Sequence, residues 1–153
     1  MTHTDFMKLA IKEARKSESV GGAPIGAILV KNGKVISTGQ SLVWPEKDPT
    51  AHGECNCIKT ACKELQSLDL KDFTLYSTLE SCSMCLGCAG WTGLTKIVFG
   101  AFLEDIQPNP YELSDYHAID HAKRIKGLEV VGGVLREECK DLMKNIKNWA
   151  PVE

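Results

Sequence analysis

The 153-residue sequence has no apolar run approaching the roughly 20 residues that a helix needs to cross a bilayer. Its start, MTHTDFMKLA, lacks the basic residues and apolar stretch of a secretory signal, so we expect a cytoplasmic protein without a membrane partner. The formal net charge of -2 gives no general attraction to nucleic acid or anionic lipid. Because repeats, low-complexity tracts and linkers are also absent, we expect one domain over residues 1–153.

Cysteine, by contrast, is abundant. The chain has seven cysteines, and an odd number cannot all pair as disulfides. In a reducing compartment, cysteine clusters more often bind metals or catalyse reactions than form crosslinks. Three of them stand at equal intervals in TLESCSMCLGCAG, residues 78–90, as Cys82, Cys85 and Cys88. Two overlapping Cys-x-x-Cys pairs could therefore hold a metal ion.

Alternating patterns of helix and strand predict an α/β fold. Helical spacing of apolar residues predicts a first helix over about residues 4–17, and two strands joined by an Asn-Gly turn follow it. Asp48 is a candidate N-cap and Pro49 a candidate first residue for a second helix, which runs to about Leu65.

The later elements continue this alternation. They are expected as a strand at 73–78, a helix at 82–90, a strand at 96–101, a helix at 113–124, a strand at 128–134 and a helix at 137–149. The last helix should bury Cys139, Leu142, Ile146 and Trp149. Helices should therefore cover both faces of the sheet, and ligands should bind at the carboxyl ends of its strands.

Three interpretations of the cysteine stretch compete. A ferredoxin-type cluster needs a fourth cysteine where this chain has Thr92. A structural zinc site could pair Cys82 and Cys85 with Cys55 and Cys57, although such sites usually use Cys-x2-4-Cys knuckles. A catalytic zinc needs only three protein ligands and leaves a fourth position for water.

The segment TAHGEC favours the catalytic zinc. His52 and Glu54 should lie in the first turn of one helix, and Cys82 and Cys85 in the first turn of the next. Helix N-termini favour thiolates, and cysteines at i and i+3 share one helix face. His-x-Glu followed by Cys-x-x-Cys is the pattern of zinc deaminases, in which the glutamate transfers protons and is not a ligand. We therefore assign His52, Cys82 and Cys85 as metal ligands, Glu54 as catalytic and Cys88 as packing.

The motifs DPTAHGE and TLESCSMCLG, with PIGAILV and IVFGA, resemble the cytidine/nucleobase deaminase superfamily over about residues 5–101. The most similar branch contains guanine deaminase, fungal-type cytosine deaminase and bacterial tRNA adenosine deaminase. The resemblance implies a three-layer α/β/α fold on a five-stranded mixed sheet, one catalytic zinc ion per chain and a homodimer. It also implies that the Gly53 N–H binds a carbonyl of the substrate ring.

Two positions depart from the pattern of that superfamily. Ser81 stands where proline usually precedes the first cysteine, and it could still cap the following helix. Ser41 stands where an asparagine amide usually meets the substrate, so the ring edge that is recognised could differ. Asp115 and Trp149 are further candidate substrate contacts, although Trp149 also fits a core position.

The predicted activity is deamination of a free nucleobase or related aminated heterocycle, as in purine salvage, with guanine slightly favoured over cytosine or a nucleoside. A tRNA substrate needs a basic surface, but residues 137–153 contain three lysines against four acidic residues. We therefore expect a small-molecule partner rather than nucleic acid. A non-catalytic zinc-binding scaffold is the remaining alternative, and the presence of Glu54 argues against it.

Overall fold

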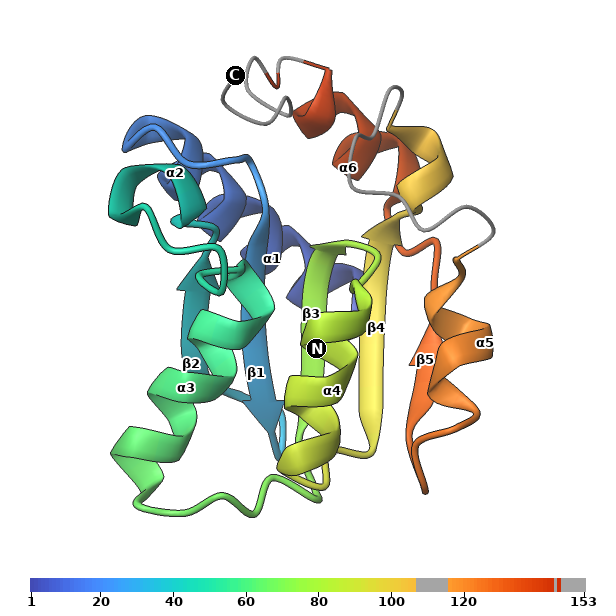
Figure 1. Cartoon of the computed structure of the whole chain (residues 1–153). Helices are drawn as coiled ribbons and strands as arrows, with labels where there is room; N and C mark the ends of the chain where they lie inside the picture. Colours follow the sequence, from blue (N-terminus) through green and yellow to red (C-terminus); the bar gives the residue numbers. More distant parts are fainter. Residues whose placement is uncertain (107–115, 145, 147–153) are drawn as a thin grey trace.

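The computed structural model describes residues 1–106, 116–144 and 146, and its centre is a five-stranded sheet in the order β2-β1-β3-β4-β5 (Figure 1). The strands are β1 (Gly26–Lys31), β2 (Lys34–Gln40), β3 (Thr74–Leu79), β4 (Lys96–Ala101) and β5 (Glu129–Val131). Strand β1 pairs antiparallel with both β2 and β3, whereas β3, β4 and β5 run parallel to one another. The sheet is therefore mixed, as expected.

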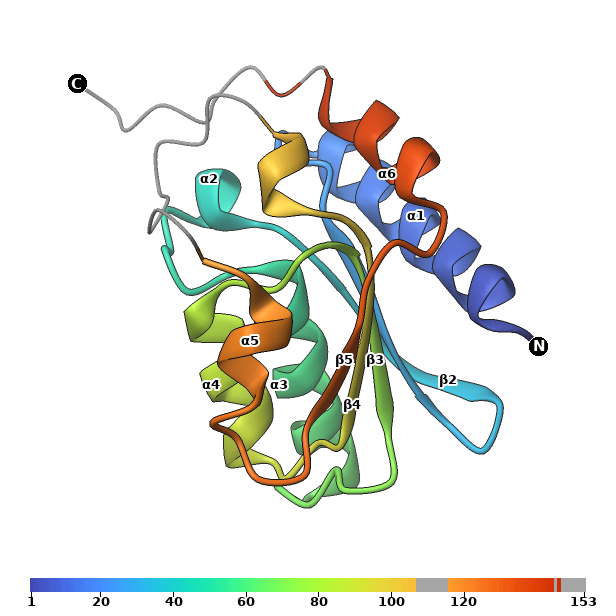
Figure 2. The same cartoon turned by 90° about the vertical axis from the view of Figure 1, so that its right-hand side faces the viewer.

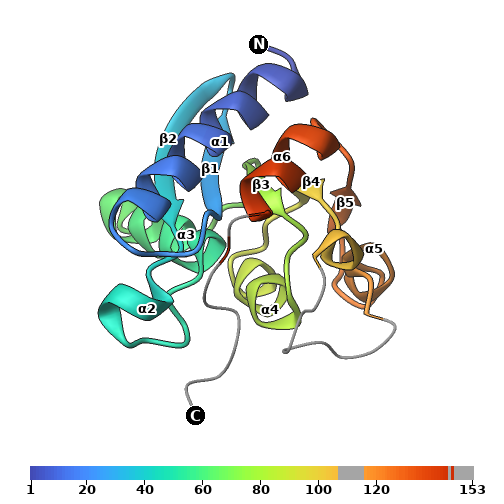
Figure 3. The ribbon, with the colours of Figure 1, turned by 90° about the horizontal axis from the view of Figure 1, so that it is seen from above.

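Helices cover both faces of this sheet. One face carries α1 (His3–Ser19) and α6 (Arg136–Met143), and the other carries α3 (Gly53–Leu65), α4 (Ser83–Trp91) and α5 (Ala118–Ala122) (Figures 2 and 3). A short helix α2 (Val43–Glu46) and a 3-10 turn η1 (Leu103–Asp105) complete the described elements. This arrangement confirms the three-layer α/β/α fold. Within the described residues, no helix combines the length and apolarity needed to cross a membrane.

The apolar run of β1 explains the two cores. Side chains of a strand alternate between faces, so Ala27 and Leu29 pack in the core under α3 and α4. Ile28 and Val30 point to the opposite face and pack in the core under α1 and α6. A central strand buried on both faces needs a continuous apolar sequence, which the segment AILV supplies.

Local signals fix the first helix and the first hairpin. Thr2 and Asp5 form a capping box at the start of α1, in which each side chain accepts the other residue's backbone N–H. Asn32 and Gly33 both have positive φ, at 51° and 73°, which is the geometry of a two-residue hairpin turn. These two elements therefore form where the sequence predicted them.

The second predicted helix starts later than expected. Helix α3 begins at Gly53 with His52 as its N-cap, so the assignments of Asp48 as N-cap and Pro49 as first residue were wrong. The Asp48 carboxylate instead accepts the Thr50 N–H at 2.8 Å and the Thr50 hydroxyl at 2.7 Å, which closes a local turn. This turn carries the chain from α2, which was not predicted, to the start of α3.

The C-terminal elements agree in order and differ in length. Helix α5 occupies Ala118–Ala122 of the segment expected over 113–124, and β5 is shorter than the predicted strand. Helix α6 buries Cys139 and Met143, and Leu142 and Ile146 pack partly buried against the same core. Trp149 lies outside the described residues.

Candidate active site

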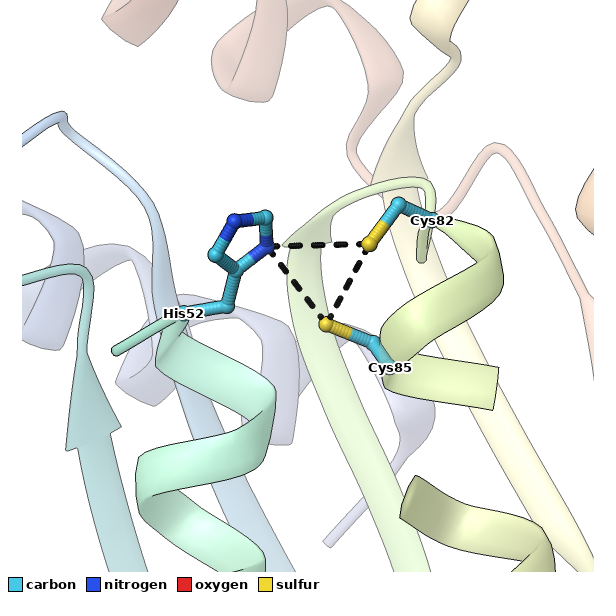
Figure 4. A group of neighbouring side chains, drawn as sticks. All are labelled: His52, Cys82 and Cys85. Carbon is cyan, nitrogen blue, oxygen red and sulfur yellow. Dashed lines mark hydrogen bonds between the residues drawn. The ribbon is translucent and has the colours of Figure 1, made fainter. Parts of the chain in front are cut away.

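The starts of α3 and α4 lie together at the sheet edge where β2 and β3 end (Figure 4). His52 is the N-cap of α3 and Cys82 is the N-cap of α4, and Cys85 lies in the first turn of α4. Among the described residues, the side chains of His52 and Cys82 form no capping hydrogen bond with the first turns of their helices. This position confirms the expected location at the carboxyl ends of the strands.

The three side chains converge on one point. His52 Nδ1 lies 3.7 Å from Cys82 Sγ and 3.6 Å from Cys85 Sγ, and the two sulfurs are 3.6 Å apart. Tetrahedral zinc with Zn–S bonds of about 2.3 Å and a Zn–N bond of about 2.0 Å would place these atoms about 3.5–3.8 Å apart. The donor set and its spacing therefore fit zinc, and the three residues are positioned to hold it.

The side chains of His52, Cys82 and Cys85 shift one another's pKa values. A hydrogen bond with Cys82 raises the pKa of His52 to about 9. Contacts with Cys85 and then with His52 lower the pKa of Cys82 to about 4. Sulfur contacts with Cys55 and Cys82 raise the pKa of Cys85 well above its ordinary value. Without metal, the site therefore holds a thiolate together with protons that a bound cation must replace.

Glu54 is the carboxylate of this site. It lies in the first turn of α3 and is 3% exposed. Burial, reinforced by the neighbouring Cys82 thiolate, raises the pKa of Glu54 to about 7. A carboxyl group of this kind can accept and return protons near neutral pH.

Gly53 packs the start of α3 directly against the sheet. An added Cβ at Gly53 would lie 3.2 Å from the Ile25 carbonyl oxygen, and one at Gly39 would lie 2.1 Å from the Gly53 carbonyl oxygen. Two glycines therefore allow α3 to approach β1 and β2 closely. This close packing fixes the positions of His52 and Glu54 relative to the sheet.

Ser41 follows β2 at the same edge and is buried. Its N–H donates to the Ile25 carbonyl at 3.0 Å, and its carbonyl accepts the Ser17 hydroxyl at 2.6 Å. The Ser41 backbone is therefore held by α1 and by the residue before β1. The other two candidate substrate contacts, Asp115 and Trp149, lie outside the described residues.

Ser81 does not cap α4, so that expectation was wrong. The N-cap is Cys82, and the Ser81 hydroxyl is buried without a partner among the described residues. The Ser81 carbonyl accepts the Tyr116 hydroxyl at 2.9 Å, which ties the turn before Cys82 to the chain before α5.

Two polar networks around the site were not predicted. The Asn56 amide donates to the carbonyls of Gln40 at 2.9 Å and Ala51 at 3.3 Å, and the Gln40 amide donates to Glu13 of α1. The Glu80 carboxylate is 2% exposed and accepts the N–H groups of Leu103 at 2.9 Å and Ala118 at 2.7 Å. The only sequence signal for Glu80 is its place two residues before Cys82, and residue type alone does not reveal such long-range partners.

A histidine and two cysteines at the starts of adjacent helices, beside a mixed sheet, define a class of zinc-dependent deaminases. Residues 1–101 match the family model of the cytidine and deoxycytidylate deaminase zinc-binding region. The chain belongs to this family, and zinc is its cofactor.

Individual relatives differ in substrate. The chain is 41% identical over 140 residues to a tRNA-specific adenosine deaminase from Bacillus subtilis, which covers 90% of this chain and 84% of the relative. It is 40% identical over 102 residues to a guanine deaminase from the same organism, covering 66% of this chain and 65% of the relative. The structure of a guanine deaminase from Nitrosomonas europaea superposes with a TM-score of 0.82 over 92% of this chain and 81% of that chain, at 22% identity, which supports the fold alone.

Proposed function

We propose that the chain catalyses hydrolytic deamination of a free nucleobase or related aminated heterocycle, with release of ammonia and with guanine as the favoured substrate. The observation that carries this proposal is the buried Glu54 carboxyl group, which lies two residues after a metal-ligand histidine. A purely structural zinc site has no use for a buried carboxylate beside it, so Glu54 favours an enzyme over a scaffold.

Each residue of the site has a proposed role. When bound at His52, Cys82 and Cys85, zinc supplies a water of lowered pKa, toward about 7. Glu54 accepts a proton from the attacking water and passes it to a ring nitrogen next to the carbon that carries the amine. The deprotonated water oxygen bonds to that carbon. Glu54 then takes the second proton of this oxygen and gives it to the amine, so that the C–N bond breaks, ammonia leaves and the oxygen remains on the ring as a carbonyl.

Substrate contacts are proposed at four positions. The Gly53 N–H binds a ring carbonyl, because the first N–H groups of a helix have no partner within it. Ser41 offers a hydroxyl to the ring edge from a backbone that is already fixed. Asp115 and Trp149 remain proposed contacts on the basis of the sequence.

Guanine is favoured by two features. The guanine deaminase relative is 40% identical over 102 residues. The described C-terminal helix α6 contains two basic residues, Arg136 and Lys140, against three acidic residues, Glu137, Glu138 and Asp141. A net negative helix gives little attraction to a polyanion.

Adenosine in tRNA is the second candidate. The tRNA-specific relative matches 90% of this chain and so extends well beyond the zinc-binding motifs. This match weighs against the sequence-based preference for a small molecule. Nucleic acid is therefore retained as the alternative partner.

The test is ammonia release by the zinc-loaded chain from guanine, cytosine, adenine, their nucleosides and tRNA. Glu54→Gln is the matched control, since it keeps the size of the side chain and removes its acid–base function. Release from guanine that Glu54→Gln abolishes supports the proposal, whereas release from tRNA alone selects the second candidate. Zinc binding without release from any substrate favours the scaffold.

We also propose that the chain is a homodimer in a reducing, cytoplasmic compartment. All seven cysteines are free, which suits such a compartment. Light scattering of the zinc-loaded chain measures the oligomeric state, and a monomeric mass at working concentration would contradict the dimer.

A further inference from the structure

A third sulfur lies beside the metal site without belonging to it. Cys55, in the first turn of α3, has its Sγ 3.7 Å from the Sγ of Cys85. Cys85 is also 3.6 Å from Cys82 on its other side. The sulfur of one metal ligand therefore contacts both a second ligand and a cysteine that is not a ligand.

Cys55 is too far from the rest of the triad to bind the same ion. Among the described residues, the only group of metal-ligating atoms within 4.8 Å of one another comprises His52, Cys82 and Cys85. Cys55 is half-buried rather than enclosed in the core, so small solutes can reach it more readily than the fully buried Cys57 and Cys139. Cys55 is therefore a free thiol whose sulfur contacts the sulfur of a metal ligand, Cys85.

We infer that Cys55 is an oxidation site whose product is a disulfide with Cys85, and that formation of this bond releases the zinc ion. The inference rests on the zinc site of the proposed function. A disulfide has an S–S bond of about 2.05 Å, so the two sulfurs must close about 1.7 Å from their present separation of 3.7 Å. Helices α3 and α4 carry the two residues and bring their sulfurs into contact.

The reaction needs a peroxide as oxidant and balances as follows. The Cys55 thiolate attacks one peroxide oxygen, an S–O bond forms, the O–O bond breaks, and water leaves after protonation. The Cys85 thiolate then attacks the Cys55 sulfur, the S–S bond forms, and the S–O bond breaks with loss of a second water. Two thiols and one hydrogen peroxide thus give one disulfide and two waters.

Loss of Cys85 as a thiolate removes one of three protein ligands. Zinc is bound by thiolates and not by disulfides, so only His52 and Cys82 would remain. A dithiol reductant restores both thiolates, and added zinc then refills the site. Oxidation at Cys55 therefore couples the redox state of the surroundings to the metal content of the enzyme.

Two other products are distinguishable from this one. A Cys82–Cys85 disulfide would also remove zinc, but it requires peroxide to oxidise a sulfur that the metal would bind, whereas the Cys55 sulfur is not one of the three ligands. Cys88, one turn further along α4, also neighbours Cys55. A Cys55–Cys88 disulfide would crosslink the helices and leave all three ligands in place.

The test treats the zinc-loaded full chain with hydrogen peroxide. Zinc release is followed with a chromogenic chelator, and disulfides are mapped by mass spectrometry of proteolytic peptides. We expect release of one zinc per chain together with a Cys55–Cys85 crosslink, both reversed by dithiothreitol and added zinc. Cys55→Ser should slow the release by at least an order of magnitude, whereas the matched variant Cys88→Ser should behave like the wild type.

Release at the wild-type rate from Cys55→Ser overturns the inference, as does a crosslink found only between Cys82 and Cys85 or between Cys55 and Cys88. The zinc content before treatment separates this failure from failure of the proposed function. A chain that binds no zinc at the start contradicts both. A zinc-loaded chain whose release does not depend on Cys55 contradicts the oxidation site alone.

Discussion

Ser81 and Ser37 are both buried serines, and their hydroxyl groups differ in whether they have a hydrogen-bond partner. The Ser37 hydroxyl donates to the Cys57 carbonyl at 2.9 Å, while the Ser81 hydroxyl has no partner among the described residues. Ser81→Ala should therefore raise the free energy of unfolding by about 1 kcal/mol, because it removes an unsatisfied polar group. Ser37→Ala is the matched control and should lose about 0.5–1.5 kcal/mol. Urea unfolding measures both, and a destabilised Ser81→Ala would show that its hydroxyl is satisfied.

The grouping of the three residues that are positioned to hold zinc could be predicted from sequence, because each comes from a short motif at a helix start. His52, Cys82 and Cys85 meet as expected. The contact between Cys55 and Cys85 depends on how α3 and α4 pack, and the sequence suggested Cys55 only as a ligand of the alternative structural zinc site. The Ser81 cap failed for a related reason: a one-residue shift of the helix start made Cys82 the N-cap.

At the scale of elements, the contact between α3 and β2 depends on Gly39. A Cβ at this position would lie 2.1 Å from the Gly53 carbonyl oxygen and 2.5 Å from the Cys57 nitrogen. Gly39→Ala should therefore displace α3, lower stability by roughly 1–3 kcal/mol and weaken zinc binding through His52. Urea unfolding and zinc competition with a chelator measure the two effects.

Gly87 provides the control for this substitution. It lies in α4 without positive φ, and among the described residues no atom beyond its chain neighbours and the backbone of its own helix lies within 4 Å of an added Cβ. Gly87→Ala should therefore be neutral or stabilise the chain by up to about 1 kcal/mol through helix propensity. Equal losses in the two variants would mean that the tight contact at Gly39 is not the cause.

An ion pair attaches helix α6 to the 3-10 turn η1, which follows β4. Arg136 donates to both Asp105 carboxylate oxygens, at 2.9 and 2.7 Å, and its guanidinium lies over the Phe102 ring at 4.4 Å from the centroid. Burial alone would raise the pKa of Asp105, but hydrogen bonds from Arg136 and the Phe102 N–H hold it below 3.8. The pair therefore stabilises the fold above pH 3.8, and this contribution is lost as pH falls through the lower folded-state pKa.

Asp105→Asn should accordingly be less stable than the wild type at pH 7, and the difference should shrink as the pH falls below 3.8. Urea midpoints at pH 7, 5 and 3 measure this trend. A difference that stays constant across the range would mean that the charge of Asp105 is not what holds α6.

For the molecule as a whole, the alternation of strand and helix predicted that helices cover both faces of the sheet, and the structure has an apolar core on each face. Element boundaries were predicted less well where polar side chains decide them. The Asp48–Thr50 turn delays α3, and the short helix α2 lacks the apolar periodicity that identifies longer helices. Long-range polar contacts such as that of Glu80 depend on the assembled fold.

Zinc binding joins the site to the stability of the whole fold. In the metal-free chain, the pKa of His52 is about 9 and that of Cys85 lies well above its ordinary value, so both carry protons at pH 7. Zinc must displace these protons when it binds. As long as the pH is below the pKa of a group, each rise of one pH unit should therefore increase the apparent zinc affinity about tenfold for each proton displaced. Affinity measured by chelator competition at pH 6.5, 7.5 and 8.5 should therefore rise steeply.

Because bound metal stabilises the folded state by mass action, the increase in Tm with excess zinc should also become larger as the pH rises. A flat profile would mean that zinc displaces no protons from the site.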